Sequence, residues 1–164
     1  MKIIVISDSH GNTAMVKDII STNSTAEVVI FCGDGCSDIE EIRYLFPTKM
    51  IISVRGNCDW YCNSPDSTEI TLCGKKIFIT HGQLYGVKEY YSPLIAHGHN
   101  INADIVLFGH THIQYASVDD SMLVMNPGSC AHSKYFGIIE IDDNGNIKAD
   151  GYLADKKHLE TITV

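Results

Sequence analysis

Aspartate, asparagine and histidine side chains recur in this sequence at one kind of position, directly after a run of apolar residues. These residues are Asp8, His10, Asp34, Asn57, His81, His110 and His112. Oxygen and nitrogen donors that several separate segments deliver to one place are what a site for more than one metal ion requires. The pattern therefore predicts metal-dependent chemistry, provided that the fold brings the segments together.

The sharpest of these motifs is Gly109-His110-Thr111-His112. A glycine followed by two histidines with one residue between them is expected only about 0.03 times by chance in a chain of this composition. Side chains alternate between the two faces of a strand, so imidazoles at this spacing point in opposite directions on a regular strand. His110 and His112 must therefore lie in a turn, or bind different ions.

Each remaining motif also has a plain structural interpretation. Asp8 could cap the helix that follows it, with His10 as a polar loop residue. Asp34 lies in a Cys-Gly-Asp-Gly turn, Asn57 tolerates a positive φ, and His81 could be a satisfied group at a strand end. Only their shared location after apolar runs favours a site over these alternatives.

The first third of the chain alternates apolar runs with amphipathic patterns. The expected strands are 2–7, 27–32 and 49–54, and the expected helices between them are 11–24 and 38–46. This order is typical of a parallel sheet with crossover helices. Sites in such sheets form outside the carboxyl ends of the strands, which is where the donors lie.

The rest of the chain has mostly strand patterns. The expected strands are 69–72, 76–80, 104–108, 114–118, 122–125, 137–141 and 147–152, with a helix at 87–97. Asn144-Gly145 is a strong hairpin signal between the last two strands. No repeat, linker or low-complexity segment appears, so residues 1–164 are expected to form a single domain.

Composition excludes several classes of function. The chain has 164 residues, of which 45% are hydrophobic, and a net charge of −8, which disfavours binding to extended nucleic acid. No apolar stretch is long enough to span a membrane. The apolar run at the amino terminus is too short for an export signal, so a cytoplasmic protein is expected.

The six cysteines are expected to be reduced, since no export signal precedes them. Cys32 and Cys36, like Cys58 and Cys62, are four residues apart, which leaves a structural zinc site as an alternative. The surrounding glycine, aspartate and asparagine residues disfavour that alternative.

The ordered motifs resemble the calcineurin-like metallophosphoesterase superfamily, and most closely its small, single-domain bacterial and archaeal phosphodiesterases. The motifs are Asp8-x-His10, Gly33-Asp34, Gly56-Asn57-Cys58-Asp59, His81-Gly82, Gly109-His110-x-His112 and Asn126-Pro127-Gly128-Ser129. The resemblance implies an α/β fold, a two-layer mixed β-sandwich flanked by helices in a four-layer αββα order.

The resemblance also implies roles for the donors. Asp8, His10 and His112 would hold one divalent ion, and Asn57, His81 and His110 a second, with Asp34 bridging them. These donors include no thiolate, which suits Mn²⁺ first, and also Ni²⁺, Zn²⁺, Fe or Co²⁺. The expected reaction is in-line attack by a hydroxide that bridges the ions on a small phosphodiester.

The expected catalytic residues are Asp34, Asn57, Cys58 and His81. Many members of the superfamily have a histidine directly after the asparagine ligand, where it protonates the leaving oxygen, but this chain has Cys58. A thiol is a poor replacement for an imidazolium acid. We therefore expect diesters with acidic leaving groups, such as aryl phosphodiesters, to be the best substrates. Cys58 as a covalent nucleophile is a more remote alternative.

Other functions and residues stay open at this point. The same superfamily includes a retromer subunit that uses the fold for protein binding, so a non-catalytic scaffold is an alternative, as is a phosphomonoesterase. Arg55 could contact substrate phosphate or be structural. The remaining histidines, His97, His99, His132 and His158, match no ligand position, and His132 is the least secure omission. The sequence leaves the oligomeric state open, a homo-oligomer included.

Overall fold

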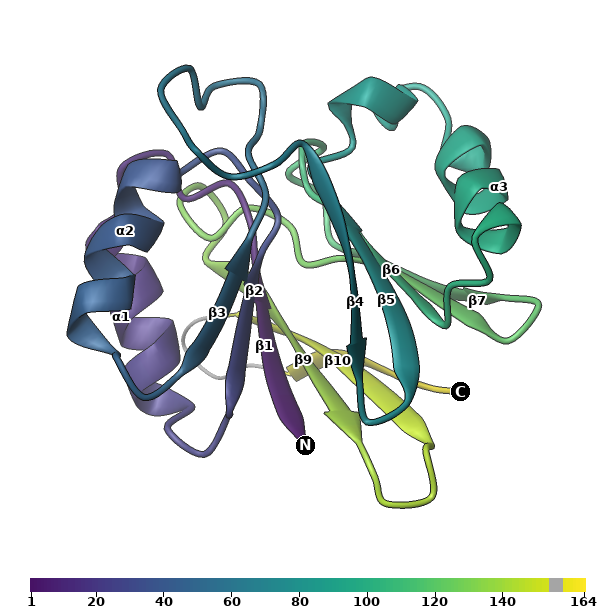
Figure 1. Cartoon of the computed structure of the whole chain (residues 1–164). Coiled ribbons are helices and arrows are strands. Elements are labelled where there is room, and N and C mark those ends of the chain that lie inside the picture. The colour runs from purple at the N-terminus through teal and green to yellow at the C-terminus, as the bar shows by residue number, and fades with distance from the viewer. Residues whose placement is uncertain (154–157) are drawn as a thin grey trace.

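The computed structural model describes residues 1–153 and 158–164. Two mixed β-sheets pack face to face and helices cover both outer faces (Figure 1). Helices α1 (Thr13–Thr22) and α2 (Cys36–Leu45) cover the first sheet, and α3 (Ser92–Asn100) covers the second. The predicted fold class, a β-sandwich flanked by helices in αββα order, is confirmed.

The first sheet has the strand order β11-β10-β9-β1-β2-β3. Its strands are β1 (Lys2–Ile6), β2 (Val28–Phe31), β3 (Met50–Ser53), β9 (Tyr135–Ile141), β10 (Ile147–Leu153) and β11 (His158–Thr163). Strands β1, β2 and β3 are parallel, and β9 runs antiparallel beside β1. The predicted parallel unit is therefore present, with an antiparallel extension.

The second sheet has the strand order β4-β5-β6-β8-β7. Its strands are β4 (Ser67–Leu72), β5 (Lys75–Thr80), β6 (Ile105–Leu107), β7 (Tyr115–Asp119) and β8 (Met122–Asn126). β5, β6 and β8 are parallel. The two-residue turn at Cys73-Gly74 joins β4 to β5, and both residues have the positive φ that such a hairpin needs.

Alternation along the strands produces three hydrophobic layers. In β1, Ile3 and Val5 face the second sheet, while Ile4 and Ile6 face α1 and α2. A third layer between the second sheet and α3 includes Val106. The central strands β1, β2, β6 and β8 are thus buried on both faces, which explains why their sequences are continuous apolar runs. The packed layers hold the strand ends, and hence the donor loops, at fixed positions.

One predicted element needs correction and one strand was missed. The helix expected at 87–97 begins only at Ser92, because Pro93 lies in its first turn, where its missing N–H is tolerated. A short 3₁₀ turn at Gln83–Tyr85 precedes it. Strand β11 was not predicted, although its β-branched residues from Thr161 on favoured a strand. None of the helices in the described residues is long and apolar enough to cross a membrane.

Candidate metal centre

The predicted donors gather at one end of the sandwich, because they lie on loops at the carboxyl ends of neighbouring strands. Asp8 and His10 follow β1, Asp34 follows β2, and Asn57 follows β3 in the first sheet. His81 follows β5, and His110 with His112 follow β6 in the second sheet. Two sheets packed face to face thus bring donors from five strands to a common edge.

Asp8, His10 and His112 form one group of donor atoms. His112 Nε2 lies 3.1 Å from Asp8 Oδ1 and 3.2 Å from His10 Nε2, and His10 Nε2 lies 3.9 Å from Asp8 Oδ1. Ligand atoms that share one ion at about 2.0–2.2 Å are roughly 3–4 Å from each other. The three side chains therefore have the spacing of a common ion site.

Asp34, His81 and His110 lie beside this first group and are linked through His81, and the donor atoms of Asp8, Asp34 and His81 all lie within 4.8 Å of one another. His81 Nε2 lies 3.4 Å from Asp34 Oδ2 and 3.2 Å from His110 Nδ1. Asp34 Oδ2 is also 4.0 Å from His10 Nε2, so this carboxylate lies between the two groups. His110 and His112 contribute to different groups, as the alternation argument allowed, and both lie in a turn beyond β6.

Backbone strain is concentrated in the donors. Asp8, His10, Asp34, His110 and His112 all have positive φ, between 43° and 69°, although none is a glycine. Such conformations cost about 1–3 kcal/mol each and persist where the surrounding structure fixes them. A Cβ on Gly56 would collide with Asp34, and one on Gly109 would collide with Ser7 and Asp8, so these motif glycines allow the close packing.

The donor groups bury negative charge without a full set of partners. Asp8 is completely buried, yet within the described residues its Oδ1 has no hydrogen-bond partner. Burial raises the pKa of Asp8, and the charge of His81 and a hydrogen bond from Ser7 only partly offset this. A buried carboxylate oxygen with no donor, surrounded by imidazole nitrogens, fits a metal ligand.

The histidines have protonation states that suit ligands. Burial and the neighbouring His81 lower the pKa of His110 to about 4, and burial lowers the pKa of His112, so both imidazoles are neutral at pH 7. Burial alone would lower the pKa of His81, but the carboxylates of Asp34 and Asp8 raise it overall. The pocket thus favours a positive charge beside His81, and a cation can replace its proton.

Hydrogen bonds around the donors fix their orientation. His81 Nδ1 lies 2.7 Å from the carbonyl oxygen of Cys32, so Nδ1 donates there and Nε2 faces the donor groups. Asp34 Oδ1 accepts a hydrogen bond of 2.8 Å from the Cys58 amide. Burial raises the pKa of Asp34, but the bonds with His81 and Cys58 lower it overall, so Asp34 is ionised.

Asp59 positions the loop that contains Asp34, a role that the sequence did not reveal. Its carboxylate accepts hydrogen bonds of 2.8–2.9 Å from the amides of Asp34, Gly35, Cys36 and Gly56. The carboxylate of Asp59 therefore links the loop after β2 to the loop after β3. The one feature of the sequence that could have indicated this role is that Asp59 is the last residue of the Gly-Asn-Cys-Asp motif.

Asn57 and Cys58 lie at the rim of the centre. Both side chains are exposed, and the Asn57 amide nitrogen lies 3.3 Å from Cys58 Sγ. Cys58 Sγ is within 4.8 Å of donor atoms of His10 and Asp34. Burial and the carboxylates of Asp34 and Asp59 raise the pKa of Cys58, so its thiol is protonated at pH 7 and the nucleophile interpretation is disfavoured.

One structural alternative for the motifs is excluded, and another is adopted. Asn12, and not Asp8, caps α1, since its side chain accepts a hydrogen bond from the Met15 amide at 3.1 Å. Arg55 is structural, because its guanidinium binds both oxygens of Asp66.

His132 lies beside the centre, so leaving it out of the site was incomplete. Its ring is 5.5 Å from that of His10 and 5.2 Å from that of His112. The Asn126-Pro127-Gly128-Ser129 loop brings it there: Ser129 Oγ donates to the Asp8 carbonyl and accepts from the His132 amide. This loop follows β8, whose carboxyl end meets the same edge.

The cysteine prediction was wrong for one pair. Cys36 and Cys62 form a disulfide, with Cα atoms 6.0 Å apart, which also excludes a zinc site that uses these two thiolates. Cys32 and Cys130 are free and buried, and Cys58 and Cys73 are free and exposed. Folding places the loop after β3 over the start of α2, a proximity that sequence spacing does not reveal.

Comparison with known proteins identifies the family. Residues 1–144 match the model of the calcineurin-like phosphoesterase superfamily domain. The chain belongs to this superfamily. It is 32% identical over 130 residues to a probable metallophosphoesterase, YsnB, of Bacillus subtilis, covering 79% of this chain and 75% of the relative. It is also 32% identical over 148 residues to a phosphodiesterase of Methanocaldococcus jannaschii, covering 79% and 84%.

Solved structures agree with this assignment. A predicted phosphoesterase of Streptococcus pneumoniae has a TM-score of 0.83 and 28% identity, over 99% of this chain and 97% of that one. Zinc-bound Vps29 of Entamoeba histolytica has a TM-score of 0.78 over 100% and 98% of the chains, but its 19% identity shows the shared fold alone. The prediction of a metal-dependent phosphoesterase of this family is confirmed.

Proposed function

We propose that this chain is a dinuclear-metal phosphodiesterase in which residues 1–164 act as one domain. Asp8, His10 and His112 would hold one divalent ion and Asn57, His81 and His110 the other, with the carboxylate of Asp34 available to both groups. The position of Asp34 is the observation that best supports the proposal. Its carboxylate lies between His81, at 3.4 Å, and His10, at 4.0 Å, so one side chain reaches both donor groups.

The residues of the chain have separate tasks in this reaction. When bound, a pair of divalent ions supplies an activated water and stabilises negative charge on the transferring phosphoryl group. His110 and His112 accept the ions without first losing a proton, because their pKa values are lowered. Asn57 and Cys58, both exposed, border the entry for the phosphoester.

Cys58 favours diesters with acidic leaving groups. Its thiol has a raised pKa and lies where many family members have a histidine acid, so it is a weak proton donor to the leaving oxygen. An aryloxide leaves without that proton, whereas an alkoxide does not. We therefore propose small aryl-type phosphodiesters as the substrate class, and disfavour a phosphomonoesterase.

A protein-binding scaffold is the main alternative, and the shared fold with Vps29 is compatible with it. The donor set argues against it, because all seven positions have metal-competent side chains and five of them keep a strained backbone or a completely buried carboxylate. A scaffold has no need to retain such costs. We further propose Mn²⁺ as the first metal to test and the cytoplasm as the compartment in which the protein acts. Assembly into a homo-oligomer is compatible with this proposal.

The test is hydrolysis of bis(p-nitrophenyl) phosphate by protein stripped with a chelator and then reloaded with Mn²⁺, Ni²⁺, Zn²⁺, Fe²⁺ or Co²⁺. We expect no activity after stripping and recovery with at least Mn²⁺. We expect Cys58→His to raise the rate on alkyl diesters more than on aryl diesters. If the reloaded protein hydrolyses no phosphoester, the proposal that it is an enzyme is contradicted and the protein-binding scaffold is favoured.

A further inference from the structure

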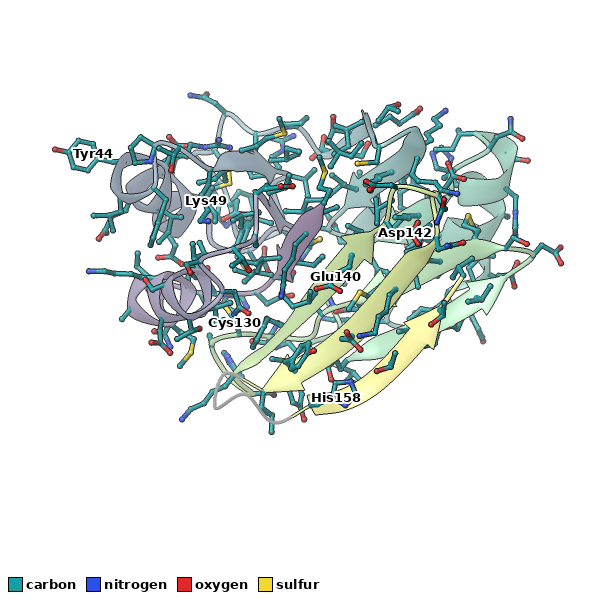
Figure 2. All side chains as sticks on the ribbon, turned by 90° about the horizontal axis from the view of Figure 1, so that it is seen from below. Tyr44, Lys49, Cys130, Glu140, Asp142 and His158 are labelled. Atoms are coloured by element: carbon teal, nitrogen blue, oxygen red, sulfur yellow. A yellow bond between two sulfur atoms is a disulfide. The ribbon has the colours of Figure 1, made fainter. Side chains whose placement is uncertain are left out.

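Two adjacent aromatic side chains stand in solvent immediately beyond the motif that contains Asn57 and Cys58. Trp60 is 84% exposed and Tyr61 is completely exposed. Exposed apolar side chains are ordinary when they are isolated, as Tyr44 is on α2, where it points away from the body of the protein (Figure 2). A neighbouring pair beside a catalytic centre is a different situation, because a ligand can cover both rings at once.

The loop that presents Trp60 and Tyr61 is fixed at several points. Asp59, directly before Trp60, binds four backbone amides, and Cys62, directly after Tyr61, forms a disulfide with Cys36 at the start of α2. At the base of the loop the Arg55 amide donates to the Pro65 carbonyl at 2.9 Å. The two rings therefore leave a constrained frame, and their exposure does not result from an untethered chain.

A hollow of about 250 Å³ lies between these rings and the start of α2. Trp60, Tyr61, the two disulfide cysteines and Cys58 are among the residues that line it. Cys58 also borders the metal centre, since its Sγ is within 4.8 Å of donor atoms of His10 and Asp34. The hollow is smaller than the roughly 300–1,000 Å³ of sites for drug-sized ligands, so it suits one ring system.

The lining also indicates what kind of group enters. None of the described residues that line the hollow is a lysine or arginine, so a second phosphate would find no counter-charge there. Its only carboxylate, that of Asp59, is occupied by backbone amides. Aromatic rings and sulfur atoms are good partners for a flat, uncharged ring.

We propose that Trp60 and Tyr61 bind the aromatic group of the phosphodiester substrate, an aryl ring or a nucleobase, while its phosphate lies at the metal centre. This inference rests on the proposed function and adds the residues that select the substrate. Cys58 lies between the two parts of the site, so the ester bond to the aromatic group lies near it. Both rings are specificity-determining residues and neither takes part in the chemistry.

Steady-state kinetics of the Mn²⁺-loaded protein test the proposal. We expect Trp60→Ala and Tyr61→Ala each to raise KM for bis(p-nitrophenyl) phosphate by about 5- to 100-fold, the range for loss of one stacking partner, with kcat nearly unchanged. The inhibition constant of inorganic phosphate, which has no ring, is expected to stay the same. Tyr44→Ala, which removes an exposed tyrosine of α2 far from this loop in sequence, is the control and is expected to leave KM unchanged.

Fluorescence provides a second readout that needs no turnover, because Trp60 is the only tryptophan in the chain. We expect p-nitrophenylphosphonate to quench the fluorescence of Trp60 saturably and methylphosphonate to leave it unquenched. We expect Tyr61→Ala to weaken the binding of p-nitrophenylphosphonate, so that higher concentrations are needed for the same quenching. AMP compared with ribose phosphate tests a nucleobase as the ring, and phenylphosphonate compared with methylphosphonate tests an aryl group.

The outcomes separate this proposal from the proposed function. Suppose that the wild-type protein hydrolyses the diester, but neither alanine variant changes KM and the aryl phosphonate does not quench Trp60. The proposed aromatic site is then wrong, and the proposed phosphodiesterase activity is retained. If no metal supports hydrolysis, the proposed function fails. In that case saturable quenching by the aryl phosphonate still supports the aromatic site, and its absence overturns it.

Discussion

Asp150, on β10, and Asp8, in the loop after β1, are two buried aspartates whose surroundings differ. Asp150, in β10, lies 3.0 Å from Lys148 Nζ and accepts a hydrogen bond from Thr161, and His158 of β11 is 3.1 Å away. Asp8, at the end of β1, has histidines around it and an Oδ1 without a hydrogen-bond partner in the described structure.

The pKa values of the two groups move in opposite directions. Burial raises the pKa of Asp150, but hydrogen bonds from Thr161 and Lys148 outweigh it and lower the pKa overall. Burial raises the pKa of Asp8 and its neighbours do not compensate. The charge of Asp150 is balanced by its neighbours in β10 and β11, whereas that of Asp8 is not, as the proposed metal site requires. The difference distinguishes a structural polar cluster from a functional one.

The largest expected effect is on catalysis. Asp8→Asn is expected to lower kcat/KM for bis(p-nitrophenyl) phosphate on the order of 10³-fold, since it removes the charge of a metal ligand that aligns the reaction. Asp150→Asn is the matched control, a buried aspartate of β10, and is expected to keep nearly full activity. Similar losses in both variants, measured with Mn²⁺ in excess, would remove the distinction.

A second pair of aspartates sharpens the comparison at the loops. Asp59→Asn is expected to reduce kcat/KM by about 10–100-fold, the range for groups that orient a ligand, because the loop containing Asp34 loses an anchor. Asp66→Asn, which removes the exposed partner of Arg55, is expected to change activity little. Full activity of Asp59→Asn with unaltered metal content would contradict this role.

Stability of the chelator-treated protein is expected to rank the two clusters in the reverse order. Asp150→Asn removes charged hydrogen bonds and is expected to lower the free energy of unfolding by about 1.5–3 kcal/mol. Asp8→Asn removes an uncompensated buried charge, so the free energy of unfolding is expected to stay the same or rise. Urea denaturation of both variants measures this, and a destabilising Asp8→Asn in metal-free protein would be the contrary result.

The smallest expected effect is the pH dependence of metal-free stability. The Asp150 contribution is present above its ordinary pKa of 3.8 and is lost as the pH falls through its lowered folded-state pKa. The Asp8 contribution is present below pH 3.8 and is lost as the pH rises through its raised pKa. Thermal melts should therefore show Asp8→Asn to be more stable than wild type at pH 7 and equal to it near pH 3.

The sequence was sufficient for features that depend on local pattern. Apolar runs identified β1, β2 and β3, and the donors after them converge as the end of a parallel sheet requires. The start of α3 was missed because the apolar pattern continues before Pro93. A proline is tolerated only in the first turn of a helix, and this places the start of α3 at Ser92. β11 was missed because an edge strand is defined mainly by its pairing with β10.

Features that depend on contacts between loops could not be predicted. The disulfide between Cys36 and Cys62 arises only when the loop after β3 folds over α2. The approach of His132 to the centre likewise depends on how the loop after β8 packs on β1. The aromatic pair at Trp60 and Tyr61 has no pattern in sequence that distinguishes it from core residues, and only its exposure reveals it.

The number of metal ions per chain tests the central claim most directly. Chelator-stripped protein is titrated with Mn²⁺ and analysed for bound metal after removal of the free ion. The seven-donor site predicts two Mn²⁺ per wild-type chain, and a loss of bound metal in a variant that lacks the Asp34 carboxylate. Wild-type protein that binds no metal, or an amount that Asp34→Ala leaves unchanged, would contradict the account.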